Sequence, residues 1–169
     1  MILLVEDEAI ARYAVAQILR FNGHEVVEAK DGTEALTLLD KYALDLVITD
    51  LIMPNLDGFA LVTRIRQKWP AVPIIIISGY TAQFAAAALT GLTEFLPKPI
   101  DPPVLIATVQ RLLAKSPKLY RRKQQSEVWH FCDTCSKWPG EDYVEQRHMP
   151  STSEVCNECI VEWHSANSQ

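Results

Sequence analysis

Cysteine is missing from the first 131 residues of this 169-residue chain, and all four cysteines lie between Cys132 and Cys159. Long apolar runs are also missing: none approaches the ~20 residues that a membrane-spanning helix needs. The short apolar run at the N-terminus has no basic residues before it, unlike a secretory signal peptide. We therefore expect a cytoplasmic protein with no membrane contact. In such a protein, cysteines are more often metal ligands than disulfide partners.

The distribution of charge suggests how the chain is divided. The net charge is −4 over residues 1–114, +4 over residues 115–127 and −5 over residues 128–169. The length suits one ordinary domain and a small second one. Together with the clustered cysteines, these shifts predict a first domain at 1–115, a basic linker at 116–127 and a small module at 128–169.

Short apolar runs alternate with amphipathic stretches through the first domain. The runs occupy residues 2–5, 26–27, 44–49, 73–77 and 95–96. Continuous apolar strands separated by helices predict a parallel sheet covered on both faces. Five such strands fit an α/β doubly wound, flavodoxin-like fold with strand order 2-1-3-4-5, whose ligands gather at the carboxyl ends of the strands.

Two local signals mark helix ends in this domain. Gly23 follows an apolar helical face and is a plausible C-terminal cap. Asp31-Gly32-Thr33-Glu34 resembles a capping box that opens the next helix.

Polar residues follow four of the five predicted strands. They are Glu6-Asp7-Glu8 after the first strand, Asp50 after the third, Ser78 after the fourth and Lys98 after the fifth. Each could be an ordinary turn or helix-start residue, but their joint position predicts one site at the sheet edge. Converging carboxylates repel one another, and a hard cation such as Mg²⁺ relieves that repulsion. A lysine and a hydroxyl nearby suit a phosphoryl group.

The segments ILLVEDE, VITDLIMPNLDG, IIIISGY and FLPKP resemble the motifs of two-component response-regulator receiver domains, over roughly residues 1–115. The resemblance implies that Asp50 accepts a phosphoryl group from a sensor histidine kinase or phosphotransfer protein. It implies that Glu6, Asp7 and Asp50 hold Mg²⁺, with the backbone carbonyl of Ile52 completing the site.

The resemblance assigns further roles to three residues near Asp50. Ser78 takes the position of the switch hydroxyl, Phe95 that of the switch aromatic and Lys98 that of the phosphate-binding lysine. An aspartate carboxylate is a competent nucleophile for a phosphoryl group, and Mg²⁺ and Lys98 would offset charge in the transition state. We expect an Mg²⁺-dependent phosphoryl acceptor with autophosphatase activity rather than a classical enzyme.

One segment departs from the family pattern. The spacing between Ser78 and Lys98 is short, and AQFAAAALTGL at 82–92 lacks a charged helix surface. Its alanines favour a helix. We therefore expect a fourth helix that is short, shifted or packed on a partner.

The four cysteines form two CxxC pairs. Cys132 and Cys135 are separated by twenty residues from Cys156 and Cys159. This pattern is a strong zinc signature, and four thiolates suit a closed tetrahedral site. About forty residues cannot bury a sufficient core without help, so a metal is physically expected. We also expect the second pair to lie on the first turn of a helix.

Other chemistries for these residues stay open. A redox couple or a disulfide could use the same thiols. His130, His148 or His164 could replace one cysteine ligand, although lone histidines are more often surface or packing residues.

The expected function is a response regulator that signals through a zinc-binding protein-interaction module. The module is acidic and has no helix-turn-helix pattern, whereas nucleic-acid binding needs a basic surface. We therefore expect a downstream protein partner rather than nucleic acid. The basic linker keeps a DNA-binding transcriptional regulator as an alternative. A phosphate sink without output and a cysteine redox sensor are the others.

Overall fold

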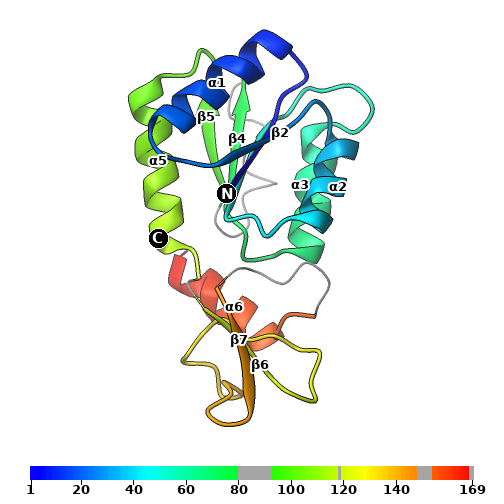
Figure 1. Cartoon of the computed structure of the whole chain (residues 1–169), viewed down its shortest axis with the longest axis vertical. Coiled ribbons are helices and arrows are strands. Elements are labelled where there is room, and N and C mark those ends of the chain that lie inside the picture. The colour runs from blue at the N-terminus through cyan, green and yellow to red at the C-terminus, as the bar shows by residue number, and fades with distance from the viewer. Residues whose placement is uncertain (80–92, 118, 148–153, 168–169) are drawn as a thin grey trace.

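The computed structural model describes residues 1–79, 93–117, 119–147 and 154–167 (Figure 1). A parallel sheet with strand order β2-β1-β3-β4-β5 forms the centre of the first domain, as predicted. Its strands are β1 (Ile2–Val5), β2 (Val26–Ala29), β3 (Leu46–Asp50), β4 (Ile74–Ser78) and β5 (Thr93–Pro97). Its helices are α1 (Ala9–Phe21), α2 (Gly32–Lys41), α3 (Gly58–Lys68) and α5 (Pro102–Lys115). The predicted α/β flavodoxin-like fold is confirmed. The segment expected to form a fourth helix, 82–92, lies outside the described residues.

Helices cover both faces of the sheet, with α1 and α5 on one face and α2 and α3 on the other (Figure 1). In β1, Ile2 and Leu4 pack with the α1–α5 side, whereas Leu3 and Val5 pack with the α2–α3 side. Every residue of β1, β3 and β4 is buried. This two-sided burial explains why these strands are continuous apolar runs rather than alternating ones.

The helix ends follow the local signals. Gly23 has φ +83°, a left-handed conformation that glycine adopts without steric cost, and it lies just beyond α1. The Asp31 side chain accepts hydrogen bonds from the backbone N–H groups of Thr33 and Glu34 at the start of α2. Both predicted caps are confirmed.

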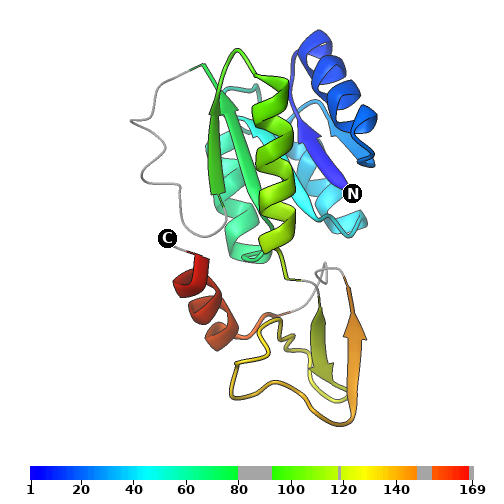
Figure 2. The same ribbon diagram turned by 90° about the vertical axis from the view of Figure 1, so that its left-hand side faces the viewer.

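The C-terminal module consists of a hairpin and a helix (Figure 2). Strands β6 (Tyr120–Lys123) and β7 (Tyr143–Gln146) pair antiparallel, and α6 spans Asn157–Asn167. The sequence placed β6 in a linker, whereas the structure makes it part of the module. The reason lies in its side chains: Tyr120 is buried, and the guanidinium of Arg121 stacks over Tyr143, with 4.1 Å to the ring centroid.

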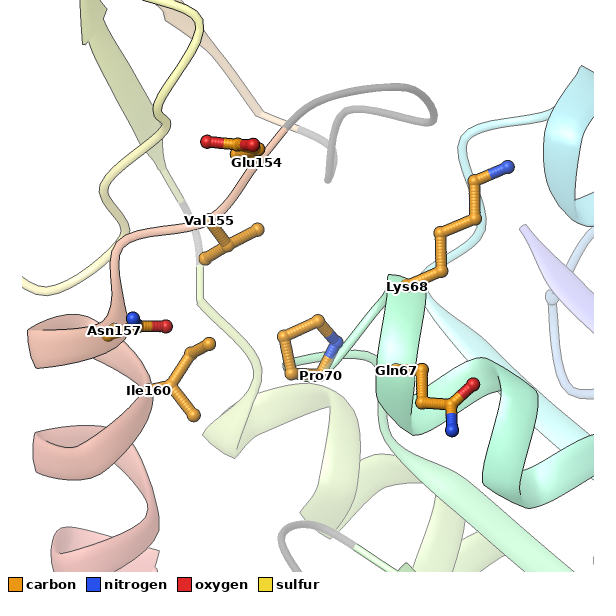
Figure 3. A pocket seen from close by; sticks show the side chains of 7 residues that line it. All are labelled: Gln67, Lys68, Pro70, Glu154, Val155, Asn157 and Ile160. Atoms are coloured by element: carbon orange, nitrogen blue, oxygen red, sulfur yellow. The ribbon is translucent and has the colours of Figure 1, made fainter.

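The module packs against the sheet edge where the strands begin. Trp69 and Val72, which precede β4, share one apolar cluster with Tyr120 and Trp129 of the module. A cavity of about 550 Å³ lies beside this contact (Figure 3). It is lined by Gln67, Lys68 and Pro70 at the end of α3 and by Glu154, Val155, Asn157 and Ile160 of the module. Among the described helices, none has the length and apolarity to cross a bilayer.

Candidate functional sites

Three carboxylates converge at the opposite edge, where the strands end. Glu6 follows β1 and Asp50 ends β3, and these two strands are neighbours in the sheet. One carboxylate oxygen from each of Glu6, Asp7 and Asp50 lies within 4.8 Å of the others. Glu6 and Asp50 are buried and Asp7 is exposed. Such an oxygen-only cluster matches the ligand preference of Mg²⁺.

Lys98 reaches this cluster from the end of β5. Its Nζ lies 2.8 Å from Oε2 of Glu6 and 2.5 Å from Oδ2 of Asp50. Desolvation lowers the pKa of Lys98, but its hydrogen bonds to Asp50 and Glu6 outweigh that effect, so the net pKa is raised. The lysine therefore stays cationic beside Asp50, where it can bind an anionic group.

The other predicted residues lie beside Asp50 or in the next two strands of the sheet, β4 and β5. The backbone N–H of Ile52 donates to Oδ1 of Asp50 at 3.1 Å. Ser78 is buried at the end of β4, one residue beyond the Asp50–Ile77 register pair. Phe95 in β5 is half-buried and packs against the core. Ile52 and Ser78 thus lie at the expected edge, whereas Phe95 lies in the middle of β5, opposite Ile76. The chemical roles of all three residues stay predictions.

Gly58 is a site residue that the sequence reasoning missed. A Cβ at this first position of α3 would lie 1.9 Å from the backbone oxygen of Asp50. The amide of Gly58 also donates to the oxygen of Leu51 at 2.9 Å. The chain therefore needs a residue without a side chain here, and the Asp57-Gly58 pair that opens a helix was the available signal.

A second cluster lies in the module and differs from the predicted set. Nδ1 or Nε2 of His130 and the sulfurs of Cys135, Cys156 and Cys159 lie within 4.8 Å of one another, and all four residues are buried. Cys159 lies in the first turn of α6, as predicted, whereas Cys156 immediately precedes the helix. Cys132 is not in this group, since its sulfur contacts Thr134 and Glu162 instead.

Burial shapes the electrostatics of this second cluster. It raises the pKa of the Cys159 thiol to about 12 and also raises the pKa of Cys135. Burial lowers the pKa of His130, which favours the neutral imidazole. Buried thiols become thiolates when a cation compensates their charge, so the donor set is chemically suited to zinc.

Comparisons with known proteins identify the first domain. A model of the family described as "Response regulator receiver domain" matches residues 2–110. The chain is 36% identical over 118 residues to the sensor kinase CckA of Brucella abortus, covering 68% of this chain and 12% of the kinase. The structure is similar to that of the Vibrio cholerae chemotaxis protein CheY4, with a TM-score of 0.62 and 33% identity over 66% of this chain and 96% of that one.

A third relative was crystallised with its metal. The receiver domain of the sensor histidine kinase PA1611 from Pseudomonas aeruginosa has magnesium coordinated in its active-site cleft. It has a TM-score of 0.62 and is 28% identical, over 67% of this chain and 96% of that one. The chain spans less than two thirds of the length of the curated relatives it matches, and these matches cover about two thirds of this chain.

Proposed function

Since this chain belongs to the response regulator receiver domain family, we propose that Asp50 accepts a phosphoryl group in a two-component phosphorelay. The observation that carries the proposal is the contact of Asp50 with Lys98 inside a cluster of three carboxylates at the ends of the strands. The donor would be a sensor histidine kinase or a phosphotransfer protein.

The residues around Asp50 support this chemistry. One carboxylate oxygen of Asp50 attacks phosphorus, the P–N bond to the donor histidine breaks, and an acyl phosphate forms. Lys98 contacts Asp50 and Glu6, so its ammonium group can bind the anionic oxygens of the incoming phosphoryl group. The Ser78 hydroxyl donates to the phosphoryl group and Phe95 fills the space that the hydroxyl leaves, so that phosphorylation biases a two-state element.

A magnesium ion fits the carboxylate cluster. Glu6, Asp7 and Asp50 would hold it with the carbonyl of Ile52, and the relative from Pseudomonas aeruginosa binds magnesium in its active-site cleft. When bound, the cation offsets negative charge on the phosphoryl group and supports autophosphatase activity.

The module is proposed to be the output end of the protein, held together by zinc. Its two CxxC pairs and the buried thiol cluster support a metal site. Reduced thiols require a reducing compartment, which fits the expected cytoplasmic location.

A protein partner fits the surface of the module better than DNA does. Arg121 pairs with Glu145 and stacks on Tyr143, while Arg122 donates to backbone oxygens of its own hairpin. Both arginines of the basic run are therefore engaged within the module. Binding to duplex DNA that falls with rising salt would instead favour the transcriptional alternative.

The test combines phosphorylation with partner capture. The full-length protein is treated with acetyl phosphate and Mg²⁺, and intact-mass spectrometry should detect one phosphoryl group per chain. Asp50→Ala should abolish that mass shift, whereas Asp40→Ala, which removes an exposed carboxylate paired with Lys68, should leave it unchanged. Phosphorylation that persists in Asp50→Ala would refute the assignment of the acceptor.

Pull-downs with and without the phosphoryl mimic beryllofluoride then test the output. A partner that binds the wild type in a mimic-dependent way and ignores Asp50→Ala supports signalling. A biological response that survives deletion of residues 117–169 would favour the phosphate sink instead.

A further inference from the structure

We propose that zinc in the module is bound by His130, Cys135, Cys156 and Cys159, and that Cys132 stays outside the metal site as a free thiol. This inference rests on the proposed zinc function and specifies which residues carry it. It replaces one of the four cysteines expected from the sequence with a histidine.

The distances within the cluster match tetrahedral zinc. With Zn–S of about 2.3 Å and Zn–N of about 2.0 Å, a tetrahedron places two sulfurs about 3.8 Å apart and a sulfur and a nitrogen about 3.5 Å apart. The sulfurs of Cys135 and Cys156 are 3.8 Å apart. Nδ1 of His130 lies 3.4 Å from the sulfur of Cys135 and 3.8 Å from that of Cys159. These three distances are close to the tetrahedral values, and all four donor atoms lie within 4.8 Å of one another.

The backbone holds His130 in this position from two sides. Its N–H and C=O exchange hydrogen bonds with Arg121 of β6, at 2.7 and 2.8 Å. The preceding residue, Trp129, forms an isolated β-bridge with the segment before Cys156. The Trp129 N–H donates to the backbone oxygen of Glu154, and the Cys156 N–H donates to that of Trp129. The backbone of His130 is therefore fixed between the hairpin and the second cysteine pair, which restricts the orientation of its ring.

Cys132 has a different environment from the other three thiols. It is half-buried, whereas the others are buried. Its sulfur lies 2.9 Å from Oε2 of Glu162, a contact in which a neutral thiol donates to a carboxylate. The same sulfur lies 2.7 Å from Oγ1 of Thr134. Cys132 thus has polar contacts of its own and is not part of the group of four donor atoms that lie within 4.8 Å of one another.

Two carboxylates one turn apart on α6 hold the first CxxC loop in this arrangement. Glu162 accepts from the hydroxyl of Thr134 at 2.6 Å, and Glu158 accepts from the N–H and hydroxyl of Ser136 at 2.6 and 2.8 Å. Three thiolates around zinc carry a net charge of −1, whereas four would carry −2. The smaller negative charge of the three-thiolate site is repelled less by Glu158 and Glu162, which lie beside it on α6.

The first experiment asks which thiol is free. Purified full-length protein with about one zinc per chain is treated with N-ethylmaleimide under native conditions, and the modified peptides are mapped by mass spectrometry. We expect modification of Cys132 alone, and modification of all four cysteines once a chelator has removed the zinc. Protection of Cys132 in the zinc-loaded protein would overturn the ligand assignment.

The second experiment compares matched variants by zinc content and by competition with a chelator. Cys132→Ser should keep zinc with an affinity near that of the wild type, whereas Cys135→Ser should lose it. His130→Ala should weaken zinc binding by more than about tenfold, because even the loss of a partner behind a ligand costs 10–100-fold. If Cys132→Ser loses zinc as Cys135→Ser does and His130→Ala keeps it, four cysteines bind the metal and the proposed zinc function stands. Wild-type protein that binds no zinc would overturn both proposals.

Discussion

Gly58 shows how closely the backbone is fitted around Asp50, the proposed phosphoryl acceptor. The first turn of α3 passes the carbonyl of Asp50 at a distance that leaves no room for a Cβ. The conformation of Asp50 therefore depends on a residue that carries no functional group.

We predict that Gly58→Ala impairs phosphorylation of Asp50 by acetyl phosphate and lowers the melting temperature. A Cβ at 1.9 Å from the Asp50 oxygen forces α3 or the end of β3 to shift. The matched control is Gly140→Ala, where an added Cβ meets no atom within 4 Å. Equal phosphorylation rates in the wild type and Gly58→Ala would show that the site tolerates the shift.

At the scale of single elements, the start of α2 depends on one side chain. Asp31 accepts from the N–H groups of Thr33 and Glu34, and Asn55 reaches its other oxygen at 3.4 Å. The hydrogen bond from Glu34 is the main cause that lowers the pKa of Asp31 below 3.8. Because the folded pKa lies below the unfolded one, the charged cap stabilises the fold above about pH 3.8, and this contribution is lost as pH falls through the folded pKa.

We predict that Asp31→Ala lowers the melting temperature at pH 7 and that the difference from the wild type shrinks below pH 3.8. Asp31→Asn is the control, because asparagine also caps helices but does not titrate. Its melting temperature should stay nearer that of the wild type at pH 7. A wild-type advantage over Asp31→Ala that is constant from pH 7 to pH 3 would contradict a charged cap.

In the whole molecule, the module and Asp50 lie at opposite edges of the sheet. The module contacts the residues that precede β4. Tyr120 of the module is buried there, and this burial raises the pKa of its hydroxyl, with a smaller effect from the charge of Asp45 just before β3. Asp50 ends β3, a five-residue strand that spans roughly 15 Å. Communication between the sites must therefore pass through the sheet, its helices or a partner rather than through direct contact.

We predict that Tyr120→Ala destabilises the whole chain by about 3–5 kcal/mol, the usual cost of removing a buried aromatic side chain. Tyr120 belongs to the core cluster that the two parts share, and its ring lies 5.9 Å from that of Phe131. Val144→Ala, a change to an exposed residue of β7, should cost less than about 1 kcal/mol. Urea unfolding measures both. A Tyr120→Ala midpoint close to that of Val144→Ala would show that the shared core contributes little.

Local patterns predicted most of the first domain. Apolar runs such as residues 73–77 encode buried strands directly, and caps such as Asp31 depend only on neighbouring backbone. The convergence of Glu6, Asp50 and Lys98 followed from the general rule that parallel strands end at one edge. The structure was needed for Gly58, because the close approach of α3 to Asp50 depends on how the loop between them packs.

The amino-acid sequence by itself determined the order of the elements, the edge of the sheet where Glu6, Asp50 and Lys98 meet and the presence of a cysteine-rich module. Only the tertiary structure showed that Tyr120–Lys123 forms a strand paired with β7 of that module. It also showed that the ring of His130, rather than the thiol of Cys132, lies next to the three buried thiols. Spacing along the chain shows which residues are near one another in sequence. The direction of a side chain such as Cys132 depends on partners about thirty residues away, here Glu162 on α6.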